Sequence, residues 1–201
     1  MKTRIISTIA SVVLFVFFAA AQDDVTTNLD NASSNYSSGD LENTRFELQT
    51  ALNGVNRAIG EAVLDIMPET LGGMAIVPES DNVMGTNNAF AGLTVNRDYK
   101  SETRDASFSI LSDSPLLASV SSLLNMSVFI AADENQKRIK LDGYRALMTR
   151  EEDSDGEVSY SFQLPFGNSL MTFDCNGVSD EDEFISIAES IPVKEIIDIT
   201  Q

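Results

Sequence analysis

The feature that most constrains the fold of this chain is a succession of alternating apolar and polar residues between positions 137 and 175. In its clearest stretch, residues 158–164, the apolar members are Val158, Tyr160, Phe162 and Leu164. A period of two is typical of a strand with one buried face. Short turn sequences separate this stretch from its neighbours, and one of them, Asp142-Gly143, is a hairpin signal. Because short connections favour antiparallel pairing, we predict an antiparallel β-meander over residues 137–175.

Three other stretches carry apolar residues at spacings of three and four, which is the pattern of an amphipathic helix. The first stripe consists of Leu48, Ala51, Leu52, Val55, Ala58, Ile59, Ala62 and Val63. The same segment contains Gly54 and Gly60, and each costs about 1 kcal/mol of helix propensity relative to Ala, so packing must hold this helix. We expect the second helix over residues 114–128 and the third over residues 179–191.

Further extended segments are expected over residues 74–77, 90–99 and 105–111, ahead of the second helix. The tail, Val193–Gln201, is too apolar for a free end, and we expect it to dock on the body or to add an edge strand. Taken together, the elements predict the α+β class: an antiparallel sheet packed with about three helices.

The first 40 residues divide into two parts of opposite character. Residues 1–21 combine basic Lys2 and Arg4, an apolar stretch over residues 5–18 and a closing run of alanines, the pattern of a cleaved signal peptide. An uncleaved anchor helix is the alternative, because the apolar stretch approaches the length of a membrane span. Residues 22–40 are mostly Asp, Asn, Ser and Thr. Such a composition buries little apolar surface, so we predict a disordered polar leader.

These boundaries leave residues 41–201 as a single α+β domain. The signal peptide predicts a secreted or periplasmic protein. No later segment is long and apolar enough for a spanning helix, so we expect no membrane span after cleavage.

Composition limits the chemistry available to the chain, which has no His, no Trp and a single Cys at position 175. The missing His excludes Ser-His and Cys-His nucleophiles and every His metal ligand. Cys175 shares its parity with Met171 and Phe173, which predicts a buried thiol rather than a reactive one. No P-loop, dinucleotide-binding or nucleophile-elbow motif is present. We therefore predict no enzymatic activity, no catalytic residues and no cofactor.

The formal net charge is −18, from 13 Lys and Arg against 31 Asp and Glu. A field of this sign repels the phosphates of nucleic acid, so nucleic acid is not an expected partner.

The densest acidic run, residues 151–157, resembles part of a calcium loop. With Glu151 at position one, Asp153 and Asp155 fall at positions three and five, where such a loop places oxygen ligands. Phe162 then occupies position twelve, where the loop needs a bidentate Glu. We interpret the run as a solvated hairpin turn and predict no metal site. The calcium candidates that stay open are Asp153, Asp155 and Glu157.

The order of elements resembles the Mog1/PsbP-like layout of small secreted α+β proteins, of which the DcrB-like periplasmic proteins are one group. The residues that carry the resemblance are Ile139, Leu141, Gly143, Tyr144 and Ala146, the strand around Phe173, and the closing helix over residues 179–191. The resemblance covers most of residues 41–192 in pattern. It implies that layout and a non-enzymatic role, and it transfers no site residue.

Three functions remain open from the sequence. The first is a non-enzymatic accessory protein that binds an unknown protein partner, with ligand-binding residues unknown. The second is a carrier of a lipid or small apolar ligand held between the sheet and the helix over residues 114–128. The third is a hydrolase that uses carboxylates alone. An exposed apolar patch on a closed core favours the first, a large apolar cavity the second, and two convergent acids in a cleft the third.

Overall fold

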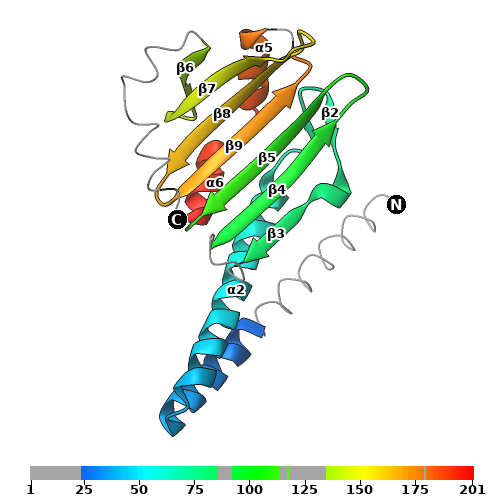
Figure 1. Ribbon diagram of the computed structural model, residues 1–201. Helices are drawn as coiled ribbons and strands as arrows, with labels where there is room; N and C mark the ends of the chain where they lie inside the picture. Colours follow the sequence, from blue (N-terminus) through cyan, green and yellow to red (C-terminus); the bar gives the residue numbers. More distant parts are fainter. Residues whose placement is uncertain (1–23, 86–91, 114–116, 118–134, 179) are drawn as a thin grey trace, which may run out of the picture.

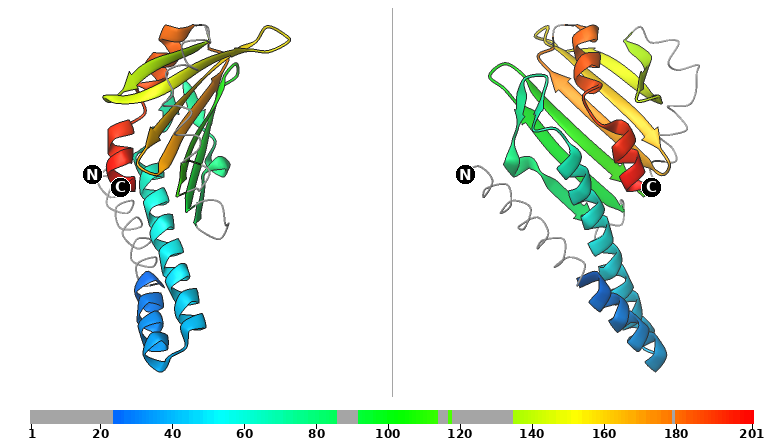
Figure 2. Two further views of the ribbon diagram at one scale, coloured as in Figure 1. Left: turned by 60° about the vertical axis from the view of Figure 1, so that its left-hand side comes forward. Right: turned by 180° about the vertical axis from the view of Figure 1, so that it is seen from behind.

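The computed structural model describes residues 24–85, 92–113, 117, 135–178 and 180–201. An antiparallel sheet of nine strands forms the body, with helices packed on one face (Figures 1 and 2). The predicted α+β class is therefore confirmed. The strands are β1 (Thr70–Leu71), β2 (Met74–Ile76), β3 (Asn82–Gly85), β4 (Leu93–Lys100), β5 (Asp105–Ser112), β6 (Gln136–Leu141), β7 (Tyr144–Glu152), β8 (Val158–Phe166) and β9 (Ser169–Asn176). The helices are α2 (Leu41–Ile66), α5 (Glu181–Ala188), α6 (Val193–Thr200) and a further one formed by residues 24–38, besides the short 3₁₀ helix η1 (Pro78–Ser80).

The meander predicted over residues 137–175 is confirmed as β6 to β9, each paired with the next. The strand order is β1-β2-β4-β5-β9-β8-β7-β6, and β3 also pairs with β4. The pairing of β9 with β5 joins the meander to the first half of the sheet. In that register Phe108 lies opposite Phe173, which lies opposite Phe162 on β8. Three aromatic side chains from three strands therefore meet in one row across the sheet.

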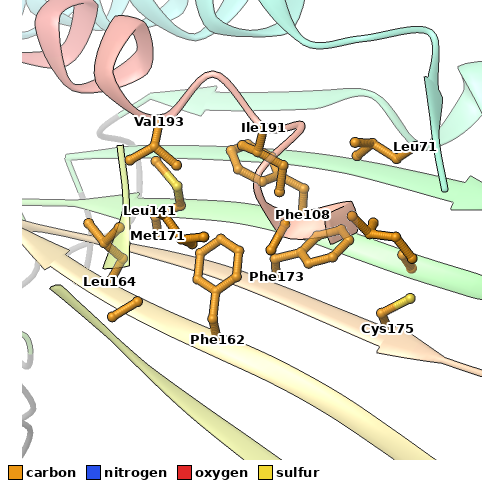
Figure 3. Close-up of a cluster of buried hydrophobic side chains, with 14 of the residues drawn as sticks. Leu71, Phe108, Leu141, Phe162, Leu164, Met171, Phe173, Cys175, Ile191 and Val193 are labelled. Atoms are coloured by element: carbon orange, nitrogen blue, oxygen red, sulfur yellow. The ribbon is translucent and has the colours of Figure 1, made fainter. Parts of the chain in front are cut away.

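This row is the centre of the core (Figure 3). The ring centroid of Phe173 lies 5.8 Å from that of Phe162 and 6.0 Å from that of Phe184 on α5. Ile191, in the connection between α5 and α6, and Val193, the first residue of α6, are also fully buried over the sheet. Large side chains from the sheet and the helices thus fill the interior, as a close-packed core requires.

The chain downstream of β9 closes this core with two helices. Asp180 is the N-cap of α5, its carboxylate accepting a hydrogen bond from the Glu183 backbone N–H at 2.9 Å. The apolar tail docks on the body as α6, with Ile196 and Ile197 buried. The predicted second helix, over residues 114–128, lies outside the described residues except for position 117.

Residues 24–38 differ from the sequence-based expectation of a disordered leader over residues 22–40, because they form a helix. Val25, Leu29, Ala32 and Tyr36 recur at steps of four, three and four along it. Of these, Ala32 is buried and Val25 lies against Gly54 of α2, while Leu29 and Tyr36 stay exposed. The contact through Val25 and Ala32 gives the segment a buried side that its composition alone does not indicate. The described part of the chain contains four helices where about three were expected. Two of the four, the helix over residues 24–38 and α6, are not among the predicted ones.

Candidate functional site

Two antiparallel helices project from the sheet body as a hairpin, defined here as residues 24–55 (Figures 1 and 2). Asp40 caps the second helix by accepting a hydrogen bond from the backbone N–H of Asn43 at 3.1 Å. The side-chain amide of Asn43 donates to the same carboxylate at 2.7 Å, and these hydrogen bonds hold the pKa of Asp40 below its usual range. The cap fixes the turn between the helices. The helix α2 therefore begins at Leu41, ahead of Leu48, the first residue of the predicted apolar stripe.

Small residues form the contact between the two helices of the hairpin. Ala32, Thr44 and Ala51 are buried there. Gly54 lies against Val25 so closely that a Cβ at position 54 would be 2.6 Å from a methyl carbon of that valine. Because the interface is built from small side chains, the helix backbones approach closely and the larger apolar side chains are left outside the contact.

The large apolar side chains of the hairpin gather on one surface, which we call the apolar surface. It consists of Leu29, Tyr36, Leu41, Leu48, Leu52 and Val55. Tyr36 and Leu41 are 68% and 65% exposed, and Leu48 and Leu52 are each 49% exposed. Of the large apolar side chains that are exposed in the described residues, only Phe46, Ile66 and Met84 lie outside this surface. An exposed cluster of this kind marks an interaction site in a folded protein.

A groove runs between the two helices within the apolar surface. Its volume is about 280 Å³, and its lining is Leu29, Ala32, Ser33, Tyr36, Thr44 and Leu48. On α2, Leu41, Leu52 and Val55 lie beside the groove, within about 40° of Leu48 around the helix at 100° per residue. Phe46, two residues before Leu48, points to the opposite side of α2 by the same geometry.

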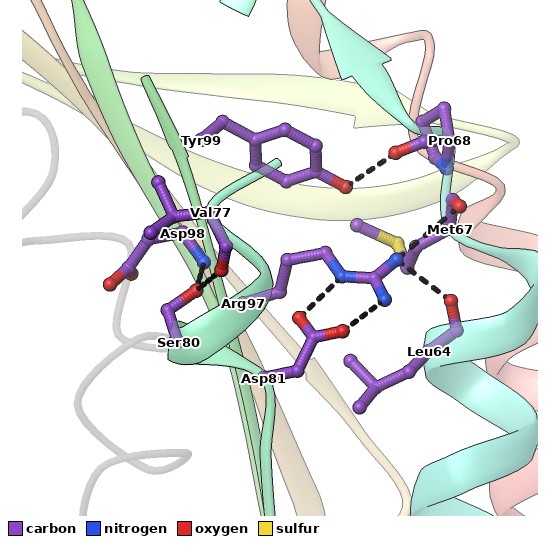
Figure 4. A network of polar contacts seen from close by, with 9 residues as sticks. All are labelled: Leu64, Met67, Pro68, Val77, Ser80, Asp81, Arg97, Asp98 and Tyr99. Carbon is purple, nitrogen blue, oxygen red and sulfur yellow. Dashed lines mark hydrogen bonds and ion pairs between the residues drawn. The ribbon is translucent and has the colours of Figure 1, made fainter. Parts of the chain in front are cut away.

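The other half of α2 is fixed to the sheet by a network around Arg97 (Figure 4). The Arg97 guanidinium forms two hydrogen bonds to the Asp81 carboxylate, at 2.8 and 2.6 Å. It also donates to the carbonyl oxygens of Leu64, at 2.8 Å, and Met67, at 3.4 Å. These carbonyls lie at the C-terminal end of α2, where the usual i to i+4 hydrogen bonds run out. The Leu64 carbonyl accepts a second hydrogen bond, from the backbone N–H of Met67, the C-cap residue, at 3.3 Å. The buried cation therefore anchors the helix from which the hairpin projects.

The contacts of the network raise the pKa values of both Arg97 and Tyr99. The hydrogen bonds to Asp81 raise the pKa of Arg97. Burial raises the pKa of Tyr99, although the neighbouring Arg97 acts in the opposite direction. The Tyr99 hydroxyl donates a hydrogen bond to the carbonyl of Pro68, in the connection after α2, at 2.9 Å. Arg97 and Tyr99 both donate to backbone carbonyls, and Asp81 holds the Arg97 guanidinium, so the network has a structural role.

No family model matches the chain, and neither a curated protein nor a solved structure matches it. Its site must therefore be argued from its own residues. The Mog1/PsbP-like layout stays a resemblance in pattern.

The three calcium candidates lie in the turn between β7 and β8. One carboxylate oxygen of Asp153 accepts hydrogen bonds from the backbone N–H groups of Asp155 and Glu157, each at 2.9 Å. The Asp153 carboxylate thus closes the hairpin turn that the sequence predicts. Within the described ranges, no group of three or more acidic or Cys side chains is placed so that it could hold a metal ion.

A hydrolase that uses carboxylates alone needs two acids in a cleft, and Glu102 and Asp174 are both exposed. Glu102 lies in the turn between β4 and β5, and Asp174 lies on β9, on the sheet face away from the core. Partial desolvation on the sheet, and secondarily the nearby Glu151, raise the pKa of Asp174. A raised pKa on an open sheet face does not by itself provide the paired acids that glycoside hydrolysis requires.

Cys175 is fully buried on the core face of β9, which confirms the sequence-based prediction. Burial raises the pKa of its thiol to about 11. Because the thiolate is the nucleophile, this thiol is unreactive at neutral pH.

Sequence reasoning missed the apolar surface, although part of the signal is visible. Leu48, Leu52 and Val55 were assigned to a core-facing stripe of the first helix. In the structure, the side of α2 that faces the sheet carries Asn56, Gly60 and Val63, which are buried. The helix over residues 24–38 and the length of α2 together determine which positions stay outside.

Among the described residues, no helix is both long enough and apolar enough to cross a membrane.

Proposed function

We propose that this chain is a non-enzymatic binding protein, exported from the cytoplasm, whose hairpin docks onto a protein partner. The observation that carries the proposal is the segregation of exposed apolar side chains onto the hairpin beside a sheet body whose core is filled. The resemblance to the Mog1/PsbP-like layout, whose members mostly have no assigned activity, supports the non-enzymatic part. Export rests on the signal-peptide pattern of residues 1–21.

The shape of the surface favours a protein partner over a small ligand. Its groove, at about 280 Å³, falls just below the range of about 300–1,000 Å³ typical of ligand pockets. The apolar side chains continue beyond the groove along α2, at Leu52 and Val55. A long apolar helix face with a shallow groove is the kind of surface that receives another helix.

Site-specific photo-crosslinking tests this proposal. A photoreactive amino acid replaces Leu48 in the full chain, produced in its native source, and adducts are identified by mass spectrometry. The matched control carries the same group at Ser107, an exposed position on the outer face of β5. We expect a discrete protein adduct from position 48 and none from position 107. Equal labelling at the two positions, or recovery of only lipid at position 48, would contradict the proposal.

A further inference from the structure

We propose that the apolar surface is occupied by a second copy of this chain, so that two hairpins pair as a four-helix bundle. The inference rests on the proposed function and names the partner for the same surface. Three observations carry it: the spacing of the apolar side chains, the shape of the surface and the charge around it.

The spacing of the apolar residues on α2 is that of a helix that pairs with other helices. Leu48, Leu52, Val55 and Ile59 follow one another at steps of four, three and four. A repeat of 3.5 residues keeps the stripe facing a neighbouring helix along its length. Ile59 packs against the body, while Leu48, Leu52 and Val55 are exposed. The stripe therefore continues beyond the contacts that the chain makes with itself.

The surface also contains both parts of a self-complementary contact. A two-fold interface uses the same surface on both copies, so a ridge and a matching groove must lie side by side. The groove lies at the level of Thr44 and Leu48, and Leu52 and Val55 form a ridge one turn further along α2. An antiparallel pairing centred near Gln49 brings Leu52 of each copy level with the groove of the other.

The charge around the surface permits two acidic molecules to meet there. In a chain with a formal net charge of −18, the groove is lined without a carboxylate. By helix geometry, Arg45 lies about 60° and Gln49 about 100° from Leu48 on the side away from the first helix, and Glu47 lies about 100° from Leu48 on the other side. The groove lining therefore adds no repulsion between carboxylates when two copies meet, and it offers no carboxylate to a basic partner.

The size of the surface fits a dimer of moderate stability. Six large side chains, each about half exposed, present on the order of 600 Å², taking roughly 200 Å² for a fully exposed large side chain. A stable interface buries about 800 Å² on each partner. The remainder has to come from the polar side chains at the rim, because Ala32, Thr44 and Ala51 are already buried between the two helices.

Analytical ultracentrifugation of the purified full chain tests the inference. We expect a dimer that dissociates on dilution between about 100 and 1 μM, because association follows mass action. The variants Leu48→Glu and Leu52→Glu should raise the dissociation constant more than about 30-fold, the effect of losing a central apolar anchor. Phe46→Glu is the matched control, since Phe46 is 63% exposed on the opposite side of the same helix. It should leave the dissociation constant unchanged.

Three outcomes would overturn the inference. They are a wild-type chain that stays monomeric at about 100 μM, equal weakening by Phe46→Glu, and a monomer that floats with phosphatidylcholine vesicles through the same leucines. Circular dichroism of each variant shows whether it keeps its fold. Each of these outcomes leaves the photo-crosslinking test standing: a monomer that gives an adduct with a different protein from position 48 supports the proposed function and refutes self-association.

Discussion

The sheet body and the hairpin differ in which side chains they bury: large ones in the body and small ones in the hairpin. In the body, the largest side chains, such as Phe108, Phe162 and Phe173, lie inside and are fully buried. In the hairpin, Ala32, Ala51 and other small residues lie inside, and leucines and a tyrosine lie outside. A body of this kind is complete as a single chain. The two-helix hairpin leaves its large apolar residues outside, so on the proposal above it buries them against a second molecule.

The largest expected effect tests whether the core of the sheet body is closely packed. Phe173→Ala should lower the free energy of unfolding by about 3–5 kcal/mol, because it leaves a cavity at the centre of a packed aromatic row. Urea denaturation measures the change. A loss below about 1 kcal/mol would mean that the sheet and α5 are not closely packed around Phe173.

The next effect tests the joint between body and hairpin. Arg97→Met should cost about 3 kcal/mol, because it leaves Asp81 and the last carbonyls of α2 without their donor. The double variant Arg97→Met/Asp81→Leu should recover part of the loss in the same urea titration, since it removes the unpaired carboxylate. If the double variant is less stable than the single one, the pair is not the source of the effect.

A smaller effect depends on pH and again concerns the body. The thiol of Cys175 has a pKa of about 11 in the folded protein and 9.0 when exposed. Since the folded pKa is the higher, this thiol contributes stability below pH 9 that is lost as pH rises through 11. We expect a loss of about 1 kcal/mol between pH 9 and pH 10.

The control for this prediction is Cys175→Ala, which is less stable at every pH but should lack that part of the decline. Urea titrations of both proteins at the two pH values give the comparison. Identical slopes would show that other groups, such as Tyr99, cause the change.

The smallest expected effect concerns the hairpin. At a dilution where the chain is monomeric, Leu52→Glu should change the free energy of unfolding by no more than about 0.5 kcal/mol, as surface substitutions do. The same titration as for Phe173→Ala measures it. A loss comparable with that of Phe173→Ala would place Leu52 in the core and remove the distinction between the two regions.

The sequence predicts the body better than the hairpin, for a physical reason. Alternation over residues 158–164 reports a local property of a strand, and the strand is found there as part of β8. The pairing of β9 with β5 depends on residues about 60 positions apart, such as Phe108 and Phe173, and no local pattern encodes it.

The sequence-based prediction for the first helix of the hairpin is wrong because the two helices of the hairpin depend on each other for burial. Residues 24–38 have a polar composition, and only contact with α2 through Val25 and Ala32 gives them a buried side. Once the helix over residues 24–38 was missed, the outer leucines of α2 could only be assigned to the core. The acidic run over residues 151–157 shows the opposite case, since the turn that Asp153 closes is a local structure and the sequence predicts it.

Hydrogen–deuterium exchange of the wild-type chain at several protein concentrations tests the central claim most directly. We expect amide protection in residues 41–55 to increase with concentration, while protection in β5, β8 and β9 stays constant. Protection that does not change with concentration in residues 41–55, or that increases across the sheet instead, would contradict it.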